Sequence, residues 1–526
     1  MRVPEFVTAK EVVKTIKDGD VFGMVGMTLV GSPEEILKEM ERSYLEEGTP
    51  RDLTFFHSAG ISDKVGGMNR LGHEGMLKRI IGSHWGLAPN LMEIITDNKV
   101  EAFCMPLGVC AHLHSAVNRR EPALITTTGL GTFIDPRLEG GKMNERTKAL
   151  KEDLVELIQI DGKDYLKYHY TKLDHLIIRG TYADELGNIS TIDEGCILEL
   201  LPAVLATKKF GGKVIVQVRQ KVGTGSIPPK QVTIPGVFVD YVVVAENPFE
   251  NHRQSSGWYQ DDTYSGQIRA PYAELDIYPM NERKVIGRRA LMQLKKNSII
   301  NVGTGIPNDT VGPILAEENL MDDIMITVES GVYGGVPAGG IDFGISQNTV
   351  ALISVNEQFD FYEGAGVDYT FMGCGEMDAE GNVNSTKMGN IAPGSGGFVD
   401  ITSAAKNIVF CSTFMGKGLK CRFSEEKGVE ILSEGKICKV VKEVTQVSLN
   451  GKLASRNGQN VYYVTERCVF RIDENGPELI EIAKGIDLQK DILDKMEFIP
   501  RISPDLKQIP TSIYVEGKFG LKDMIS

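Results

Sequence analysis

One stretch of the sequence is the most informative about the fold, and it reads Ile324-Met-Ile-Thr-Val-Glu329-Ser-Gly-Val-Tyr-Gly-Gly-Val-Pro-Ala-Gly-Gly340. It consists of a short apolar run, a carboxylate and a series of glycines. The β-branched and apolar residues 324–328 are typical of a buried strand. Glu329 follows directly, and five of the ten residues from 331 to 340 are glycine. Ligands of open α/β sheets bind outside the carboxyl ends of strands, where Glu329 would project. Glu329 can be a nucleophile, which a bulky acyl group approaches closely because the glycines have no side chains. The alternative is an ordinary solvated acid at a turn.

The length and composition indicate a globular protein with more than one domain. A chain of 526 residues is too long for one hydrophobic core, and 42% apolar and 24% charged residues are ordinary globular values. No run of about 18 apolar residues appears, and the first residues lack the apolar core of a secretory signal. We therefore expect a cytoplasmic protein without a membrane span. A net charge of −14 argues against a nucleic-acid partner.

The eight cysteines are scattered along the chain and include no C-x-x-C pair. This distribution favours reduced, buried thiols over disulfides or a zinc site. His112 and His114 lie near Cys110 and have the residue types of metal ligands, but this grouping is a weak signal, and we predict no metal site.

Two parts of the chain follow the same plan of strand, glycine loop and helix. The first has a strand over 21–25, a loop over 26–31 and a helix with Ser32 as N-cap and Pro33 at its first position. The second has a helix over 285–294, a strand over 299–302, a glycine loop over 303–309 and a helix over 311–316. Segments 183–191 and 378–386 are also similar, in the same order. The repetition predicts two related halves.

We predict an α/β protein in which two related open α/β domains are fused in one chain. Fully apolar strands over 213–218, 241–245 and 408–411 support a parallel sheet in each half. The polar, aromatic stretch between the halves is not of low complexity, so we interpret it as an ordered surface linker. The predicted boundaries are 1–246 for the first domain, 247–282 for the linker and 283–526 for the second domain. In the tail we expect strands over 460–465 and 468–472, then loops and a short basic helix.

Several long motifs resemble those of the family I coenzyme A transferases. In the second half these are Glu329-Ser-Gly331, Gly303-Thr-Gly-Ile-Pro307 and Gly394-Ser-Gly-Gly-Phe398. In the first half, similarity to the single-chain propionate/acetate CoA-transferases lies in Gly129-Leu-Gly-Thr-Phe-Ile-Asp-Pro-Arg137, Ile178-Arg-Gly-Thr-Tyr-Ala-Asp184 and Ile234-Pro-Gly-Val-Phe-Val-Asp240. The resemblance covers nearly the whole chain, with the motifs in the family's order.

The resemblance implies transfer of coenzyme A from an acyl-CoA to a short-chain carboxylate such as acetate, propionate or butyrate. It marks Glu329 as the residue that carries CoA covalently, with CoA as substrate and covalent intermediate and no further cofactor. It also implies a homo-oligomer, often a tetramer. Substrate-binding positions are predicted at Leu107, Gly108 and Gly331. Many relatives have Gln where this chain has Leu107, so the pocket here should be more apolar.

The chemistry assigns roles to further residues. At neutral pH a glutamate with an ordinary pKa near ~4.3 is ionised, so we expect Glu329 to be ready for attack. Each step passes through an oxyanion, for which backbone amides of Gly396, Gly397, Gly303 and Gly305 are the candidate donors. These glycines can equally serve tight turns. Lys417 and Lys420 are candidates for the CoA phosphates, or else they are solvated surface residues.

Three other functions fit parts of the sequence. An acyl-CoA hydrolase of the same fold would differ only in how well the site keeps water out. A non-catalytic acyl-CoA-binding protein would not need Glu329 and both glycine loops. A sugar-phosphate isomerase of related fold would not explain the two halves.

Overall fold

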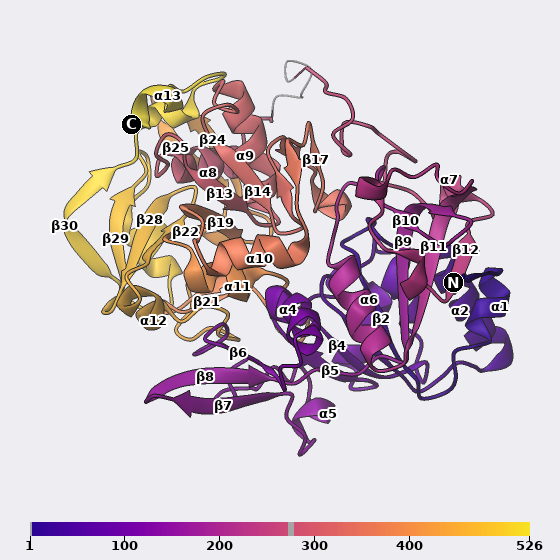
Figure 1. Cartoon of the computed structure of the whole chain (residues 1–526). Helices are drawn as coiled ribbons and strands as arrows, with labels where there is room; N and C mark the ends of the chain where they lie inside the picture. Colours follow the sequence, from indigo (N-terminus) through magenta and orange to yellow (C-terminus); the bar gives the residue numbers. More distant parts are fainter. Residues whose placement is uncertain (1–2, 272–277, 526) are drawn as a thin grey trace.

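The computed structural model describes residues 3–271 and 278–525. Within these residues the chain forms two large, mostly parallel sheets, one from each half, which lie side by side (Figure 1). We call residues up to 246 the first half and residues from 283 the second half. The α/β class with two open sheets is confirmed.

The first sheet has nine strands among the described residues, in the order β1-β12-β11-β9-β2-β3-β4-β5, with β10 paired to β9. Its strands are β1 (Glu5–Phe6), β2 (Val21–Met24), β3 (Leu53–His57), β4 (Leu77–Gly82), β5 (Glu101–Cys104), β9 (His175–Asp184), β10 (Ile189–Ser190), β11 (Lys213–Val222) and β12 (Tyr241–Val244). All neighbours are parallel except β9 and β10. Apolar side chains along these strands are buried, as expected for a parallel sheet.

The second sheet has ten strands among the described residues, in the order β18-β15-β14-β13-β19-β22-β27-β28-β29-β30. Its strands are β13 (Ile299–Val302), β14 (Met325–Val328), β15 (Val332–Tyr333), β18 (Ala351–Leu352), β19 (Tyr369–Gly373), β22 (Asn407–Cys411), β27 (Asn460–Val464), β28 (Cys468–Asp473), β29 (Gly476–Ile482) and β30 (Arg501–Gln508). The centre from β14 to β27 is parallel. The expected strand of residues 324–328 is β14, which pairs in parallel with β13.

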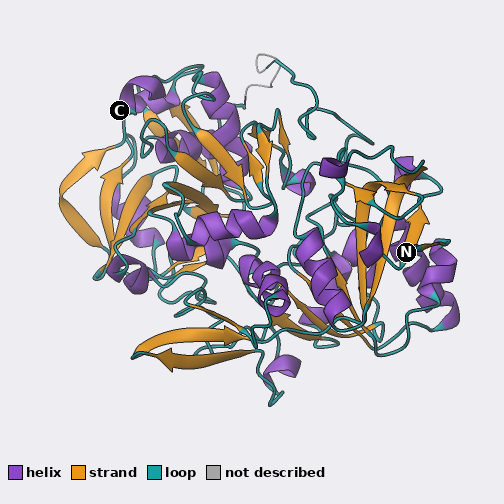
Figure 2. Cartoon of the chain, in the orientation of Figure 1, coloured by secondary structure: helices purple, strands orange, loops and turns teal. Residues whose placement is uncertain are grey.

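Both halves also contain smaller sheets. The three strands β6 (Leu124–Thr126), β7 (Val155–Ile160) and β8 (Lys163–Tyr168) form a sheet whose β7–β8 hairpin projects from the body (Figure 2). The other small sheets are strand pairs: β16 (Val336–Pro337) with β17 (Ser346–Gln347), β20 (Glu376–Met377) with β21 (Val383–Asn384), β23 (Met415–Gly416) with β26 (Ile437–Cys438), and β24 (Lys420–Ser424) with β25 (Gly428–Ser433).

Helices cover both sheets and meet where the halves join. They are α1 (Ala9–Val13), α2 (Glu34–Glu47), α3 (Pro89–Thr96), α4 (Leu107–Asn118), α5 (Glu145–Lys148), α6 (Leu200–Lys209), α7 (Pro248–Asn251), α8 (Glu282–Leu291), α9 (Ile306–Glu317), α10 (Val355–Glu363), α11 (Phe398–Ala404), α12 (Gly451–Arg456) and α13 (Leu521–Met524). Helix α4 of the first half packs against α10 and α11 of the second (Figure 1). One hydrophobic core runs through this junction.

Several predicted element ends are wrong by a few residues. The N-cap of α2 is Pro33 and not Ser32, and no side chain caps this helix. Helix α8 starts at Glu282 because Asn281 accepts a hydrogen bond from the Lys284 backbone and caps it earlier than expected. The tail contains the additional strands β29 and β30 where loops were expected. Strand β30 is exposed on both faces and lacks the apolar alternation that marks a strand in sequence.

The segment between the halves is packed against both of them. The Gln254 side chain donates to the Asp193 carbonyl in the first half, and the Ser256 backbone donates to Asp342 in the second at 2.6 Å. Trp258 is exposed, but Gln254 is buried. Residues 272–277 of the predicted linker lie outside the described residues, and the predicted domain boundaries stay a prediction.

Candidate active site

A cavity of about 350 Å³ lies between the two halves and is lined by residues of both. Its apolar wall consists of the buried side chains Met27, Leu107, Phe343, Met372 and Phe398. The carboxyl edges of both sheets contribute to it, because residues that follow β4, β13 and β14 are among its lining. Ligands of α/β sheets bind at such edges.

Glu329 follows the last residue of β14 and reaches this cavity. The Gly331 backbone then turns the chain, donating to the Val328 carbonyl at 3.0 Å with a φ of 94°. A side chain at position 331 would overlap the Ile353 carbonyl oxygen, so the turn requires glycine. Gly331 therefore shapes the turn that presents Glu329 and does not itself line the cavity.

The Glu329 carboxylate lies directly against the backbone of Gly397. A Cβ at position 397 would overlap Oε2 of Glu329, and one at Gly396 would lie 3.8 Å from Oε1. Burial raises the pKa of Glu329 to about 7, and the Gly397 backbone N–H opposes this shift. Burial thus shifts Glu329 towards the protonated form, and its ionisation at neutral pH is less complete than an ordinary glutamate pKa predicts. The sequence could not show how far the two halves remove this group from water.

The first half holds the glycine loop 392–397 in place by backbone hydrogen bonds. The Gly396 N–H donates to the Ser83 carbonyl at 3.0 Å, and the Leu107 N–H donates to the Gly396 carbonyl at 3.1 Å. Trp85 donates twice, from its backbone to Pro393 at 2.8 Å and from its indole Nε1 to the Ala392 carbonyl at 2.6 Å. The position of the glycines beside Glu329 thus depends on both halves.

The structure brings together some of the predicted site residues and not others. Glu329, Leu107, Gly303, Gly396 and Gly397 all line the cavity. The predicted site residues that do not line the cavity are Gly305, Gly108, Gly331, Lys417 and Lys420.

The residues outside the lining have other places in the fold. Gly305 is the N-cap of α9, and Gly108 packs against Phe359 and Asp400 in the first turn of α4. Lys417 and Lys420 are exposed, before and at the start of β24. The binding and oxyanion roles remain predictions.

Two cavity residues that sequence reasoning missed are His84 and Lys64. His84 comes two residues after the end of β4, as Glu329 comes after the end of β14. A polar residue just after a strand, followed closely by Gly86, is a pattern in the sequence that could have identified His84 as a site candidate. Lys64 is exposed and is the one Lys or Arg among the described residues that line the cavity.

Comparison with known proteins identifies the family. A family model described as Coenzyme A transferase matches residues 6–245. A caffeate CoA-transferase of Acetobacterium woodii is 42% identical over 524 residues, which is 98% of each chain. The chain belongs to the family I coenzyme A transferases. Members of this family move coenzyme A between an acyl-CoA and a carboxylate.

Solved structures of this transferase family match over the full length. The acetate CoA-transferase YdiF of Escherichia coli K12 is 37% identical over 99% of this chain and 96% of its own. The crystal structure of the YdiF apoenzyme from Escherichia coli O157:H7 has a TM-score of 0.91, with 36% identity over 99% of this chain and 97% of that one. A YdiF thioester complex with CoA matches with a TM-score of 0.89. The predicted family and fold are confirmed.

The described part of this transferase includes no helix that is both long enough and apolar enough to cross a membrane. Chemically, the site combines a carboxylate, an adjacent backbone donor and an apolar cavity. These are the parts that acyl transfer to and from a carboxylate requires.

Proposed function

We propose that this protein transfers coenzyme A from an acyl-CoA to a free carboxylate through a glutamyl-CoA thioester on Glu329. The observation that carries the proposal is the position of the Glu329 carboxylate. It stands at the end of β14, inside the cavity between the halves and against the Gly397 amide. A nucleophile with a donor directly beside it is suited to forming and collapsing tetrahedral intermediates.

The first half-reaction loads CoA onto the enzyme. An ionised Glu329 oxygen attacks the thioester carbonyl, the C–S bond breaks, and an acyl-glutamyl anhydride and CoA thiolate result. The thiolate then attacks the Glu329 carbonyl carbon and releases the first acid as a carboxylate. The Gly397 N–H is the proposed donor to the oxyanion on Glu329, because it already lies against this carboxylate.

The second half-reaction reverses these steps with a new acid. Its carboxylate attacks the glutamyl thioester, and the CoA thiolate leaves. The thiolate then attacks the acyl carbonyl of the new anhydride, which expels the Glu329 carboxylate and gives the new acyl-CoA. One thioester forms for each thioester that breaks, so the cycle needs no ATP. The apolar lining, with Leu107 and Phe398 beside Glu329, favours this transfer over hydrolysis because it limits water at the anhydride.

The proposed acceptors are short-chain acids such as acetate, propionate and butyrate. The name of one relative, an acetate CoA-transferase, supports this class. A larger aromatic acid is a second candidate, because the relative with 42% identity is named a caffeate CoA-transferase and the cavity of about 350 Å³ falls in the range of ligand pockets. We also propose a homo-oligomer.

For the CoA phosphates, Lys64 joins Lys417 and Lys420 as a candidate. Lys64 is exposed at the cavity, whereas the other two lie outside its lining. With a net charge of −14, a polyanionic substrate needs such a local cation.

Steady-state kinetics test the proposal. Initial rates are measured with acetyl-CoA, propionyl-CoA and butyryl-CoA against acetate, propionate, butyrate and caffeate. A single carboxylate that holds CoA between two acids requires parallel double-reciprocal lines. Intersecting lines would contradict the covalent route, and CoA release without any acid would indicate a hydrolase.

A further inference from the structure

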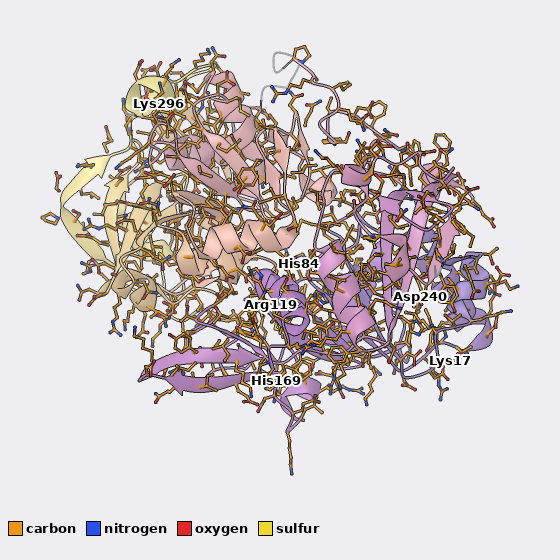
Figure 3. The ribbon with its side chains drawn as sticks, in the orientation of Figure 1. Lys17, His84, Arg119, His169, Asp240 and Lys296 are labelled. Carbon is orange, nitrogen blue, oxygen red and sulfur yellow. The ribbon has the colours of Figure 1, made fainter. Side chains whose placement is uncertain are left out.

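His84 is a polar group inside the cavity that the acyl-transfer steps leave unused. It lies at the carboxyl edge of the first sheet, and in Figure 3 its label lies where the two halves meet. Its backbone pairs with Gly394 of the second half. Its ring fits between two glycines: a Cβ at Gly60 would lie 3.1 Å from Nδ1, and one at Gly86 would lie 2.8 Å from Nε2.

The ring nitrogens are available to a ligand. Within residues 3–271 and 278–525, neither nitrogen of His84 has a hydrogen-bond partner, although the ring is only partly exposed. Burial lowers its pKa to about 4, so the ring is neutral at pH 7 and offers one donor and one acceptor.

Other polar side chains of the cavity are already engaged or lie at its rim. The hydroxyls of Thr28, Ser385 and Ser395 donate to backbone carbonyls at 2.7–3.3 Å. Thr304 and Lys64 are exposed. Among the described residues that line the cavity, His84 is thus a partly buried neutral side chain without a hydrogen-bond partner.

The glycine loop fixes how far His84 lies from the chemistry. Gly394 pairs with His84, and Gly397 contacts Glu329. Three residues of extended chain span at most about 10 Å. Because the reacting carboxyl has to meet Glu329 and Gly397, His84 lies within reach of a group bound next to that carboxyl.

We propose that His84 is a specificity-determining residue that hydrogen-bonds a hydroxyl or keto oxygen on the acyl chain. An alkyl acid would displace water from the imidazole and leave its nitrogens unpaired, whereas a hydroxy or oxo acid replaces that water. The inference rests on the proposed transfer reaction and adds a preference for oxygenated acids over alkyl acids of equal length. We expect a preference of about 10- to 100-fold in kcat/KM.

The test compares matched acids as CoA acceptors, namely lactate with propionate and 3-hydroxybutyrate or acetoacetate with butyrate. The wild type should favour the oxygenated acid of each pair. His84→Phe should bring the ratios to about one, mainly by lowering kcat/KM for the oxygenated acids. His84→Gln, which keeps an amide donor and acceptor, should retain part of the preference.

The control is His169→Phe, directly after β8, because His169 is partly exposed, pairs with Glu156 and lies outside the cavity. Its ratios should equal those of the wild type. If His84→Phe does not fold, His84→Leu takes its place. Wild-type ratios near one, or ratios unchanged in folded His84→Phe or His84→Leu, would overturn the inference.

A second readout separates this inference from the transfer mechanism. Mass spectrometry measures CoA attached to Glu329 after incubation with propionyl-CoA. His84→Phe should still form this thioester. Absence of the thioester in the wild type would instead contradict the proposed function, whatever the acid ratios are.

Discussion

At the scale of the residue, the protonation of Glu329 decides how the site works. Packing between the halves raises the pKa of this carboxyl to about 7, against the one adjacent donor, Gly397. The folded chain thus holds the Glu329 proton more tightly than the unfolded chain. This protonation contributes to the free energy of unfolding. The contribution is fully present below the ordinary glutamate pKa and is lost as the pH rises through about 7. In return, the desolvated carboxylate is a stronger base and nucleophile.

The pH dependence of thioester formation should follow this group. Only the ionised form attacks, so the rate of CoA loading should rise about tenfold per pH unit below about 7 and level off above it. Rapid-quench single turnovers with acetyl-CoA between pH 5 and 9 measure this rate. A rate that is constant from pH 5 to 8 would mean that Glu329 keeps an ordinary pKa.

Replacement of Gly397 should disturb the same carboxylate. In Gly397→Ala the added Cβ overlaps Oε2 of Glu329, so the carboxylate has to move away from the donor. Loss of one such donor typically costs about 10²–10³ in rate, and we expect kcat to fall by about that factor. Gly257→Ala is the matched control, because a Cβ there meets no atom within 4 Å. Comparable kcat in both variants would argue against contact between Gly397 and Glu329.

At the scale of the element, the start of α4 forms one wall of the cavity that contains Glu329. Asp400 of α11 accepts from the Val109 backbone at 3.2 Å, and the Leu107 N–H donates to Gly396. A Cβ at Gly108 would come within 2.8 Å of Asp400, so glycine permits this close packing. These contacts fix Leu107 at the cavity, with its side chain buried.

We therefore expect Leu107 to influence the choice of acid. Leu107→Gln adds an amide to an apolar wall, which should shift kcat/KM towards acetate and away from butyrate. A methylene in an apolar pocket is worth about 1–3 kcal/mol, so the change should be graded, roughly 10-fold or more across the series. The measurement is kcat/KM for acetate, propionate and butyrate. Identical ratios in variant and wild type would show that Leu107 does not contact the acyl chain.

Local patterns in the sequence predicted elements well where the signal was itself local. The apolar strand over 213–218 lies within β11, and the strand over 299–302 coincides with β13. The predictions failed where distant contacts decide. The exposed strand β30 pairs with β29 only in the folded sheet. The CoA-binding role of Lys417 and Lys420 stays a prediction, although both lie outside the lining of the cavity.

At the scale of the whole molecule, the active site exists only because two similar halves are held together. Glu329 and the glycine loop belong to the second half, while Ser83, Trp85 and Leu107 of the first half hold that loop. The sequence predicted Glu329 and its glycines through motifs but missed His84 and Lys64. Their place in the site depends on how one sheet faces the other.

Identification of the residue that carries CoA is the most direct test of this account. The full-length protein is incubated with acetyl-CoA in the absence of acceptor, trapped with borohydride, digested and mapped by mass spectrometry. We predict that the modification lies on the peptide that contains Glu329 and that Glu329→Ala loses both the modification and transferase activity. Modification of another carboxylate, or full transferase activity in Glu329→Ala, would contradict the central claim.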